Sequence, residues 1–343
     1  MRSFRLLALV VCIPMLVLTS FAQQPSPTQS SAPPQQPATT AAAPTVPASE
    51  QIRKTVGFLT VEYGNSLADL KGGVIGTCFF VAVPDQRLGA NQGFIYLVTN
   101  RHVAQPGIDL GTPYQVQAVM LRLNRVGPGG GLQSVSGQIL LGGQVRWFFP
   151  SDEAVDLAIL PVAPDQKSFD YLAIPSTMIV TAEQLKTGEI GVNDPVSFAG
   201  YFASFPGSIR MEPIVREGVI AMLPEEKLDT TLHKQGRLFL ADIHAFHGNS
   251  GSPVFVNLGG MHHGVLTLGE RYFLLGIISG YYPESAGFSV PAATVLTGEV
   301  HDNSGIATVV PGEELTNLLN SHEVQSDRDR QVKVLNRSGV SQK

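Results

Sequence analysis

The chain has 343 residues, a formal net charge of −5 and two cysteines. The acidic balance argues against nucleic acid as a ligand, because affinity for a phosphate backbone comes from clustered Lys and Arg. The cysteine count excludes a disulfide framework, so the hydrophobic core alone must hold the fold together.

Residues 1–22 predict a secretory signal peptide. Two arginines precede an apolar run over 6–18, and Ser20-Phe21-Ala22 has the small-x-small pattern of a cleavage site. The run is too short for a membrane span. We therefore expect cleavage after Ala22, a secreted or periplasmic location, and no stable membrane insertion afterwards.

Removal of this leader leaves a more acidic chain with one thiol. The formal charge goes from −5 to −7, because the leader contains two arginines and no acidic residue, and only Cys78 remains. Cys12 lies within the leader, but Val10 and Val11 stand where a lipid-attachment site favours small residues. A lipoprotein is therefore the lesser alternative.

Residues 23–50 predict a disordered linker. The segment contains seven prolines and no charge before Glu50. Such a composition buries too little apolar surface to offset the entropy of ordering, and proline stiffens the chain into an extended tether.

Residues 51–322 predict one all-β domain. Short apolar runs separated by Gly, Pro, Asn and Asp are typical of strands in a sandwich or barrel. Eleven segments fit this pattern: 55–64, 76–83, 93–100, 114–123, 136–149, 155–162, 194–202, 213–223, 237–243, 251–257 and 272–282. A short helix over 311–322 follows, with acids near its start and leucines on one face. Residues 323–343 read as a loose polar tail.

The string "FHGNSGSPVF" at 246–255 presents Ser250 between residues with little side chain. Such clearance suits a serine that must meet a substrate carbonyl. Gly, Asn, Ser and Pro are also common turn residues, so the string alone could be a loop that reverses the chain. A nucleophilic serine needs a base and an orienting carboxylate elsewhere.

His102 and Asp156 are the candidates for these two roles. His102 directly follows a predicted strand in "YLVTNRHVA", and Asp156 opens another in "EAVDLAILPV". Taken singly, the histidine could be a surface residue and the aspartate a turn cap. The chain order His, Asp, Ser makes coincidence less plausible.

The chain resembles the chymotrypsin-fold (trypsin-like) serine peptidases, in the bacterial, disulfide-poor branch that includes the glutamyl endopeptidases. The resemblance rests on "GTCFFV" at 76–81, "VTNRHV" at 98–103, "DLAIL" at 156–160 and "GNSGSPVF" at 248–255. It implies two packed six-stranded antiparallel β-barrels and an exported serine endopeptidase. Such an enzyme needs no cofactor or metal and acts on protein or peptide substrates.

The resemblance also implies a role for each residue. Ser250 is the nucleophile, His102 the general base and Asp156 the residue that orients it. The backbone N–H groups of Gly248 and Ser250 form the oxyanion hole. Asn249 replaces the aspartate that pairs with a new N-terminal amine in digestive relatives, so we expect a preformed loop.

Four residues are expected to bind the substrate: His244 at the base of the side-chain pocket, Ser279 and Gly280 along the substrate backbone, and Tyr281 at the pocket wall. No aspartate stands where a trypsin-like pocket needs one, unless Asp242 reaches in. The pocket should therefore favour small or medium uncharged side chains.

The sequence allows three alternative interpretations. The histidines at 244, 247, 262 and 263 could suggest a metal, but the chain lacks an H-E-x-x-H motif and has a single mature thiol. A binding protein with weak or no catalysis could keep the same fold. An esterase could use the same triad. The sequence makes no prediction about oligomeric state.

Overall fold

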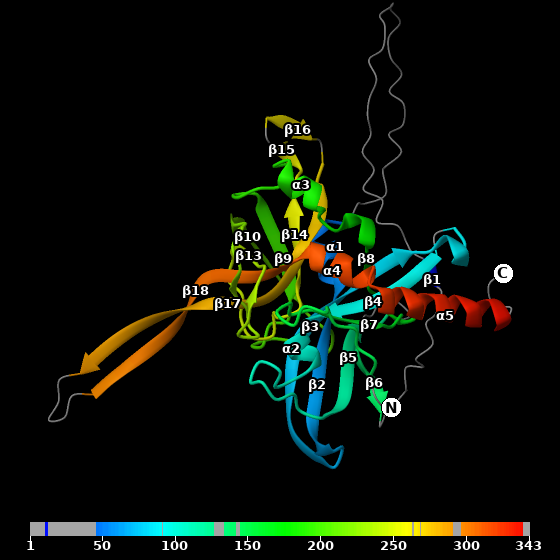
Figure 1. Cartoon of the computed structure of the whole chain (residues 1–343), viewed down its shortest axis with the longest axis horizontal. Helices are drawn as coiled ribbons and strands as arrows, with labels where there is room; N and C mark the ends of the chain where they lie inside the picture. Colours follow the sequence, from blue (N-terminus) through cyan, green and yellow to red (C-terminus); the bar gives the residue numbers. More distant parts are fainter. Residues whose placement is uncertain are drawn as a thin grey trace, which may run out of the picture.

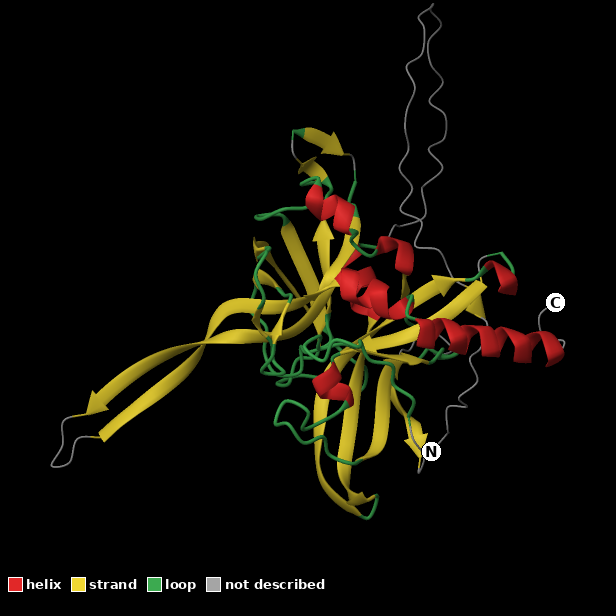
Figure 2. Cartoon of the chain, in the orientation of Figure 1, coloured by secondary structure: helices red, strands yellow, loops and turns green. Residues whose placement is uncertain are grey.

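The structure is a computed structural model that describes residues 11–12, 46–90, 92–126, 134–141, 145–262, 264–267, 269–290 and 296–338. Two β units pack together and helices cover one side of the junction (Figures 1 and 2). The predicted signal peptide and linker lie almost entirely outside these residues. Within the described part, no helix is long and apolar enough to cross a membrane.

The N-terminal unit is an eight-stranded sheet. Its strand order is β1-β4-β3-β2-β5-β6, with β7 antiparallel to β4 and β8 parallel to β3. The predicted all-β fold class is confirmed, but this unit differs from the prediction of a six-stranded antiparallel barrel. It has eight strands, and one pair of them is parallel. The strands are β1 (Val11–Cys12), β2 (Val56–Ser66), β3 (Asp69–Pro84), β4 (Gln92–Thr99), β5 (Val116–Asn124), β6 (Ser134–Leu141), β7 (Ala158–Pro161) and β8 (Ala173–Pro175).

The C-terminal unit is a closed six-stranded barrel, as predicted. Closure follows the order β10-β13-β18-β17-β14-β9, and every neighbouring pair is antiparallel. Closing the sheet leaves no unpaired barrel edge. The strands are β9 (Pro195–Gly200), β10 (Ile214–Met222), β13 (Phe239–Asp242), β14 (Pro253–Asn257), β17 (Tyr272–Val290) and β18 (Leu296–Pro311).

Strand β18 was not predicted from the sequence. Its "DNSG" string at 302–305 is typical of a turn, yet the strand passes through it. The structure accommodates the string with a register shift between Tyr281 and Pro283 on the partner strand and with Gly305 at φ 82°. Beyond this irregularity β17 and β18 leave the barrel as a long two-stranded arm (Figure 1).

Short elements fill the connections. Two hairpins, β11–β12 and β15–β16, form separate two-stranded sheets. The bounds are β11 (Leu228–Asp229), β12 (Gln235–Gly236), β15 (Gly260–His262), β16 (Val265–Thr267), α2 (Arg101–Ala104), α3 (Ala182–Lys186), and the 3₁₀ turns at Gln86–Leu88 and Ser176–Met178.

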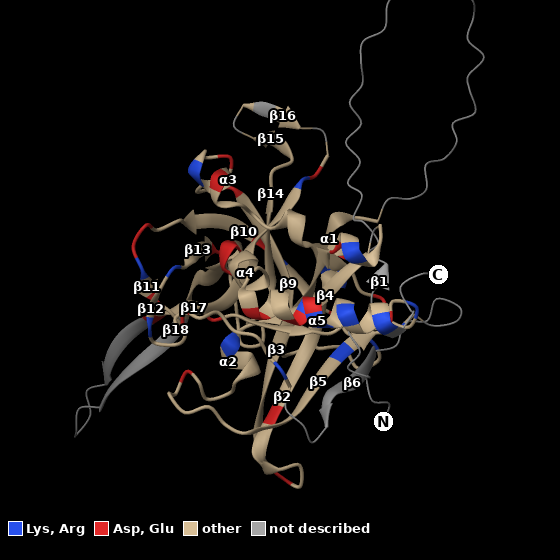
Figure 3. Cartoon of the chain, turned by 45° about the vertical axis from the view of Figure 1, so that its right-hand side comes forward, with Lys and Arg blue, Asp and Glu red and all other residues tan. Residues whose placement is uncertain are grey.

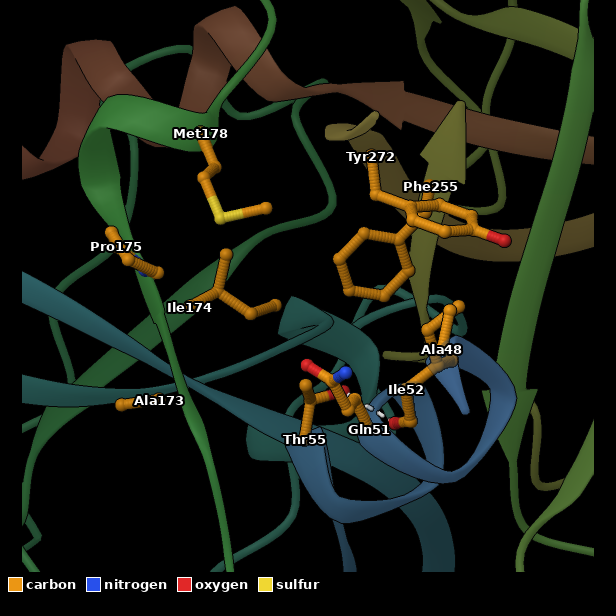
Figure 4. A pocket seen from close by; sticks show the side chains of 10 residues that line it. All are labelled: Ala48, Gln51, Ile52, Thr55, Ala173, Ile174, Pro175, Met178, Phe255 and Tyr272. Carbon is orange, nitrogen blue, oxygen red and sulfur yellow. Dashed lines mark hydrogen bonds between the residues drawn. The ribbon is translucent and has the colours of Figure 1, made fainter. Parts of the chain in front are cut away.

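Helix α1 (Ala48–Thr55) lies at the junction of the two units and begins before the predicted domain start at residue 51. The side chain of Ile52 in this helix is buried. Ile52 lines an apolar cavity of about 30 Å³ together with Ile174 of the N-terminal sheet and Phe255 and Tyr272 of the barrel (Figure 4). The helix thus packs against both units.

The predicted C-terminal helix is α4 (Gly312–Leu319), but the prediction of a loose tail after it is wrong. Residues His322–Ser338 form helix α5. Val324, Val332 and Leu335 are buried, and their spacing places them on one helical face. Figure 3 shows basic and acidic residues interspersed along the helix. Four apolar side chains among 17 residues, of which Val334 is exposed, give too weak a pattern to predict the helix.

Candidate active site

A cleft of about 400 Å³ opens where the two β units meet, and both contribute to it. His102 and Asp109 come from the N-terminal unit, and Ser250 comes from the barrel. His102 lies on α2, directly after β4, and Ser250 lies in the loop between β13 and β14. Asp156, two residues before β7, is fully buried behind His102. The fold therefore brings the three predicted residues together.

His102 and Asp156 make a two-point contact. The ring Nδ1 of His102 lies 2.7 Å from Oδ2 of Asp156, and the backbone N–H of His102 donates to Oδ1 at 3.0 Å. With Nδ1–H directed at the carboxylate, Nε2 is the ring nitrogen left to accept a proton. Burial lowers the pKa of His102, but the charge and hydrogen bond of Asp156, with a contribution from Asp109, raise this pKa above its ordinary value.

Two hydroxyl groups complete the surroundings of the Asp156 carboxylate. Oδ2 accepts hydrogen bonds from Ser279 at 2.6 Å and from Thr231 at 2.8 Å. Burial raises the pKa of Asp156, but the charge and hydrogen bonds of His102 and the hydrogen bond of Ser279 hold the pKa below its ordinary range. Asp156 is therefore a buried carboxylate surrounded only by donors.

Thr231 was missed by the sequence analysis. It lies in the connection between β11 and β12, and 75 positions separate it from Asp156. No motif marks it, because a lone threonine between two short strands has no distinctive pattern. Only the packing of the β11–β12 hairpin against the cleft reveals its contact.

Ser250 is half-buried on the floor of the cleft. Its Oγ donates to the carbonyl oxygen of Ser279 at 3.3 Å, and no hydrogen bond joins it to His102 among the described residues. Hydrogen bonds of this kind often tighten only when substrate is bound.

The loop before Ser250 forms a tight turn. The N–H of Asn249 donates to the carbonyl of Phe246 at 2.9 Å, and Gly248 has φ 92° at the third position of the turn. Positive φ at that position defines a type II turn and favours glycine. A Cβ on Gly248 would lie 2.4 Å from Cδ1 of Tyr201. In the described chain the N–H groups of Gly248 and Ser250 donate to no protein acceptor.

Neutral hydrogen bonds hold this turn in place. The buried Thr77 of β3 donates its N–H to Ser250 O at 2.8 Å and its hydroxyl to Gly248 O at 2.7 Å. The Asn249 side chain donates to Tyr201 O at 2.7 Å and accepts from Phe246 N at 2.8 Å. The loop is therefore formed without a charged partner for Asn249.

The predicted substrate-binding residues divide into two groups. Gly280 and Tyr281 line the cleft, and the Tyr281 ring meets His247 edge-on with centroids 6.2 Å apart. Ser279 also lines it, but its hydroxyl points at Asp156, so only its backbone is available to a substrate.

His244 does not lie at the base of the cleft. Alternation along the chain buries Ala245 and exposes His244 and Phe246, whose rings stack with centroids 6.3 Å apart. The prediction of a buried imidazole there is wrong, because it used only the distance along the chain from Ser250. It ignored the alternation by which successive residues point to opposite sides. Asp242 is exposed as well and does not line the cleft.

The histidines named as possible metal ligands form no metal cluster in the described part of the chain. His262 faces Asp194 with Nε2 and Oδ1 3.0 Å apart, while His247 lines the cleft. His263 is outside the described residues. No three His, Cys, Asp or Glu side chains in the described ranges cluster closely enough to hold a metal ion.

Comparison with models of protein families identifies the family of the chain. A model of the trypsin-like peptidase domain matches residues 76–261, more than half of the chain. The chain belongs to this trypsin-like peptidase family. Fold and family together define a chymotrypsin-fold serine peptidase, which acts on protein or peptide substrates.

Solved structures with a similar fold were also found. The crystal structure of Deg5 has 16% sequence identity over 67% of this chain and 81% of that chain, with a TM-score of 0.39. The crystal structure of the Rv3671c protease in an inactive form has 16% identity over 81% of this chain and 96% of that chain, with a TM-score of 0.38. Comparison with the curated proteins finds no match.

Proposed function

We propose that the protein is an exported serine endopeptidase that cleaves peptide bonds through a covalent acyl-enzyme formed on Ser250. One observation supports this most directly. The buried Asp156 orients His102 at 2.7 Å in the same cleft that contains Ser250 and the turn at Gly248. These are the parts that acyl transfer by a serine requires.

The proposed reaction assigns each group one task. Ser250 Oγ attacks the scissile carbonyl carbon while His102 Nε2 accepts the hydroxyl proton, and Asp156 stabilises the imidazolium that results. The N–H groups of Gly248 and Ser250 donate to the oxyanion of the tetrahedral intermediate. His102 then gives the proton to the leaving amine, the C–N bond breaks, and a water molecule hydrolyses the ester through the same steps.

A serine-directed phosphonate reagent tests this proposal. We expect stoichiometric labelling of Ser250, identified by mass spectrometry of the tryptic peptide, together with internal cleavage of peptides blocked at both ends. Ser252, two positions away and fully buried, is the internal control and should stay unlabelled. Absence of labelling and of cleavage in the folded protein would contradict the proposal.

We also propose that the pocket accepts small or medium uncharged side chains before the scissile bond. The support is the position of Tyr281 at the cleft beside His247, where its ring narrows the opening. Tyr281→Gly is expected to raise kcat/KM for Phe and Leu substrates relative to Ala by about tenfold, since a larger side chain gains buried area. An unchanged profile, or a dominant Glu preference in the wild type, would refute this assignment.

Export is part of the proposal and rests on the sequence of residues 1–22. We expect the mature protein, isolated from the periplasm or the medium of cells that express the whole chain, to begin at Gln23. N-terminal sequencing of that material is the measurement. Recovery of the uncleaved chain in the cytoplasm would argue against export.

A further inference from the structure

The loop after α2, residues 105–115, places a second carboxylate in the cleft. Asp109 lines the cleft together with His102 and Ser250, and its side chain is partly exposed. The catalytic steps proposed above do not use it. Its charge raises the pKa of His102, but it takes no part in the bond-making steps, so its carboxylate can have a second role toward the substrate.

The loop holds Asp109 in a fixed place. The carbonyl of Gly107 accepts from the N–H groups of Leu110 and Thr112, both at 3.1 Å, and Gly107 has φ 84°. Tyr114, near the end of the loop, stacks on Tyr63 with ring centroids 4.5 Å apart. A carboxylate on such a closed loop is held in position before any ligand arrives.

The Asp109 carboxylate forms no hydrogen bond or ion pair in the described part of the chain, although its charge acts on His102. The nearest cation along the chain, Arg101, is used elsewhere. Its guanidinium lies 5.0 Å from the centre of the Phe149 ring, and its Nε donates to Gln105 at 3.1 Å. The cleft thus presents one carboxylate that forms no ion pair with a Lys or Arg of the described residues.

The position of Asp109 indicates which part of a substrate it meets. In the proposed mechanism His102 gives a proton to the leaving amine, so the scissile bond must lie beside His102. The substrate residues that flank this bond then lie near the N-terminal unit, which also carries Asp109. Gly280 and Tyr281, which we propose to contact the residue that is attacked, line the same cleft but come from the barrel, whereas Asp109 comes from the N-terminal unit. A carboxylate in a cleft with low-dielectric walls attracts a cationic side chain more strongly than one on an open surface.

We infer that Asp109 is a specificity determinant. It selects peptide substrates with a lysine or arginine directly before or directly after the residue whose carbonyl is attacked. This inference rests on the proposed peptidase function. The inference concerns the neighbour of the residue that is attacked, which should be cationic. The residue in the pocket itself is still expected to be uncharged.

Matched peptides test the inference. Each has the same uncharged residue in the pocket and either Lys or Gln at the position before it or after it, and kcat/KM is measured at low and high salt. We expect wild type to prefer Lys over Gln by about 3- to 10-fold at one of these positions, with a smaller ratio at high salt. Asp109→Asn should bring the ratio near one while cleavage of the Gln peptides persists.

Two further variants sharpen the result. Asp109→Lys is expected to favour Glu over Lys at the same position. Glu226→Gln, which removes an exposed carboxylate outside the cleft, should keep the wild-type ratio. Equal cleavage of Lys and Gln peptides by wild type, or a Lys preference that survives Asp109→Asn, would overturn the inference. Both outcomes require active enzyme, so they differ from failure of the proposed function, in which no peptide is cleaved.

Discussion

Replacing Ser250 with alanine is expected to lower kcat for peptide hydrolysis by about 10⁴- to 10⁶-fold while the protein stays folded. The large loss follows because no other group can form the acyl-enzyme. The small effect on stability follows because, within the described residues, Oγ forms one hydrogen bond, the 3.3 Å contact to Ser279 O. The net contribution of one such bond is about 1 kcal/mol.

The measurement is steady-state hydrolysis of a chromogenic peptide, with thermal unfolding as the check on the fold. Ser252→Ala is the matched control, since it also removes one hydroxyl from the loop, and it should retain activity. Turnover by Ser250→Ala equal to that of wild type, in a preparation free of contaminating protease, would rule out Ser250 as the nucleophile.

Asp156→Asn is expected to lower kcat at neutral pH by about 10⁴-fold. Every group around this carboxylate is a donor: the ring and the backbone N–H of His102, and the hydroxyls of Ser279 and Thr231. A side-chain amide brings its own N–H₂ into that shell. One imidazole nitrogen must then change from donor to acceptor, which leaves Nε2 protonated and unable to take the proton of Ser250.

The pH profile separates this effect from simple unfolding. Because Asp156 raises the pKa of His102, wild-type kcat/KM should rise with pH through a midpoint above the ordinary histidine value of about 6.5. In Asp156→Asn the midpoint should move to lower pH, since the carboxylate that favours the imidazolium is gone. Asp170→Asn, which removes a carboxylate paired with Lys54 at the surface, should leave rate and midpoint unchanged.

Thr231→Val offers a graded version of the same measurement. It removes one hydroxyl donor from Asp156 and keeps the shape of the side chain. We expect kcat to fall by about tenfold with little change in KM, consistent with one hydrogen bond to a charged group.

An Asp156→Asn enzyme with wild-type kcat would show that His102 does not depend on this carboxylate.

The sequence by itself determined the elements that depend on local patterns. All eleven predicted segments overlap strands of the structure, because short apolar runs between Gly, Pro, Asn and Asp are a local signal for strands. The motifs around 102, 156 and 250 were recognisable for the same reason, since each lies within a few residues. The family that they indicated is confirmed by the match over 76–261.

The tertiary structure alone decided the contacts between distant segments. Ser279 and Thr231 reach Asp156 across 123 and 75 positions, and no local pattern encodes such a separation. Strand β18 forms despite its turn-like string because β13 and β17 supply hydrogen-bond partners on both sides. Helix α5 forms because its few apolar side chains pack against the rest of the protein. In most proteins such packing stabilises a helix more than the helix propensity of its residues does.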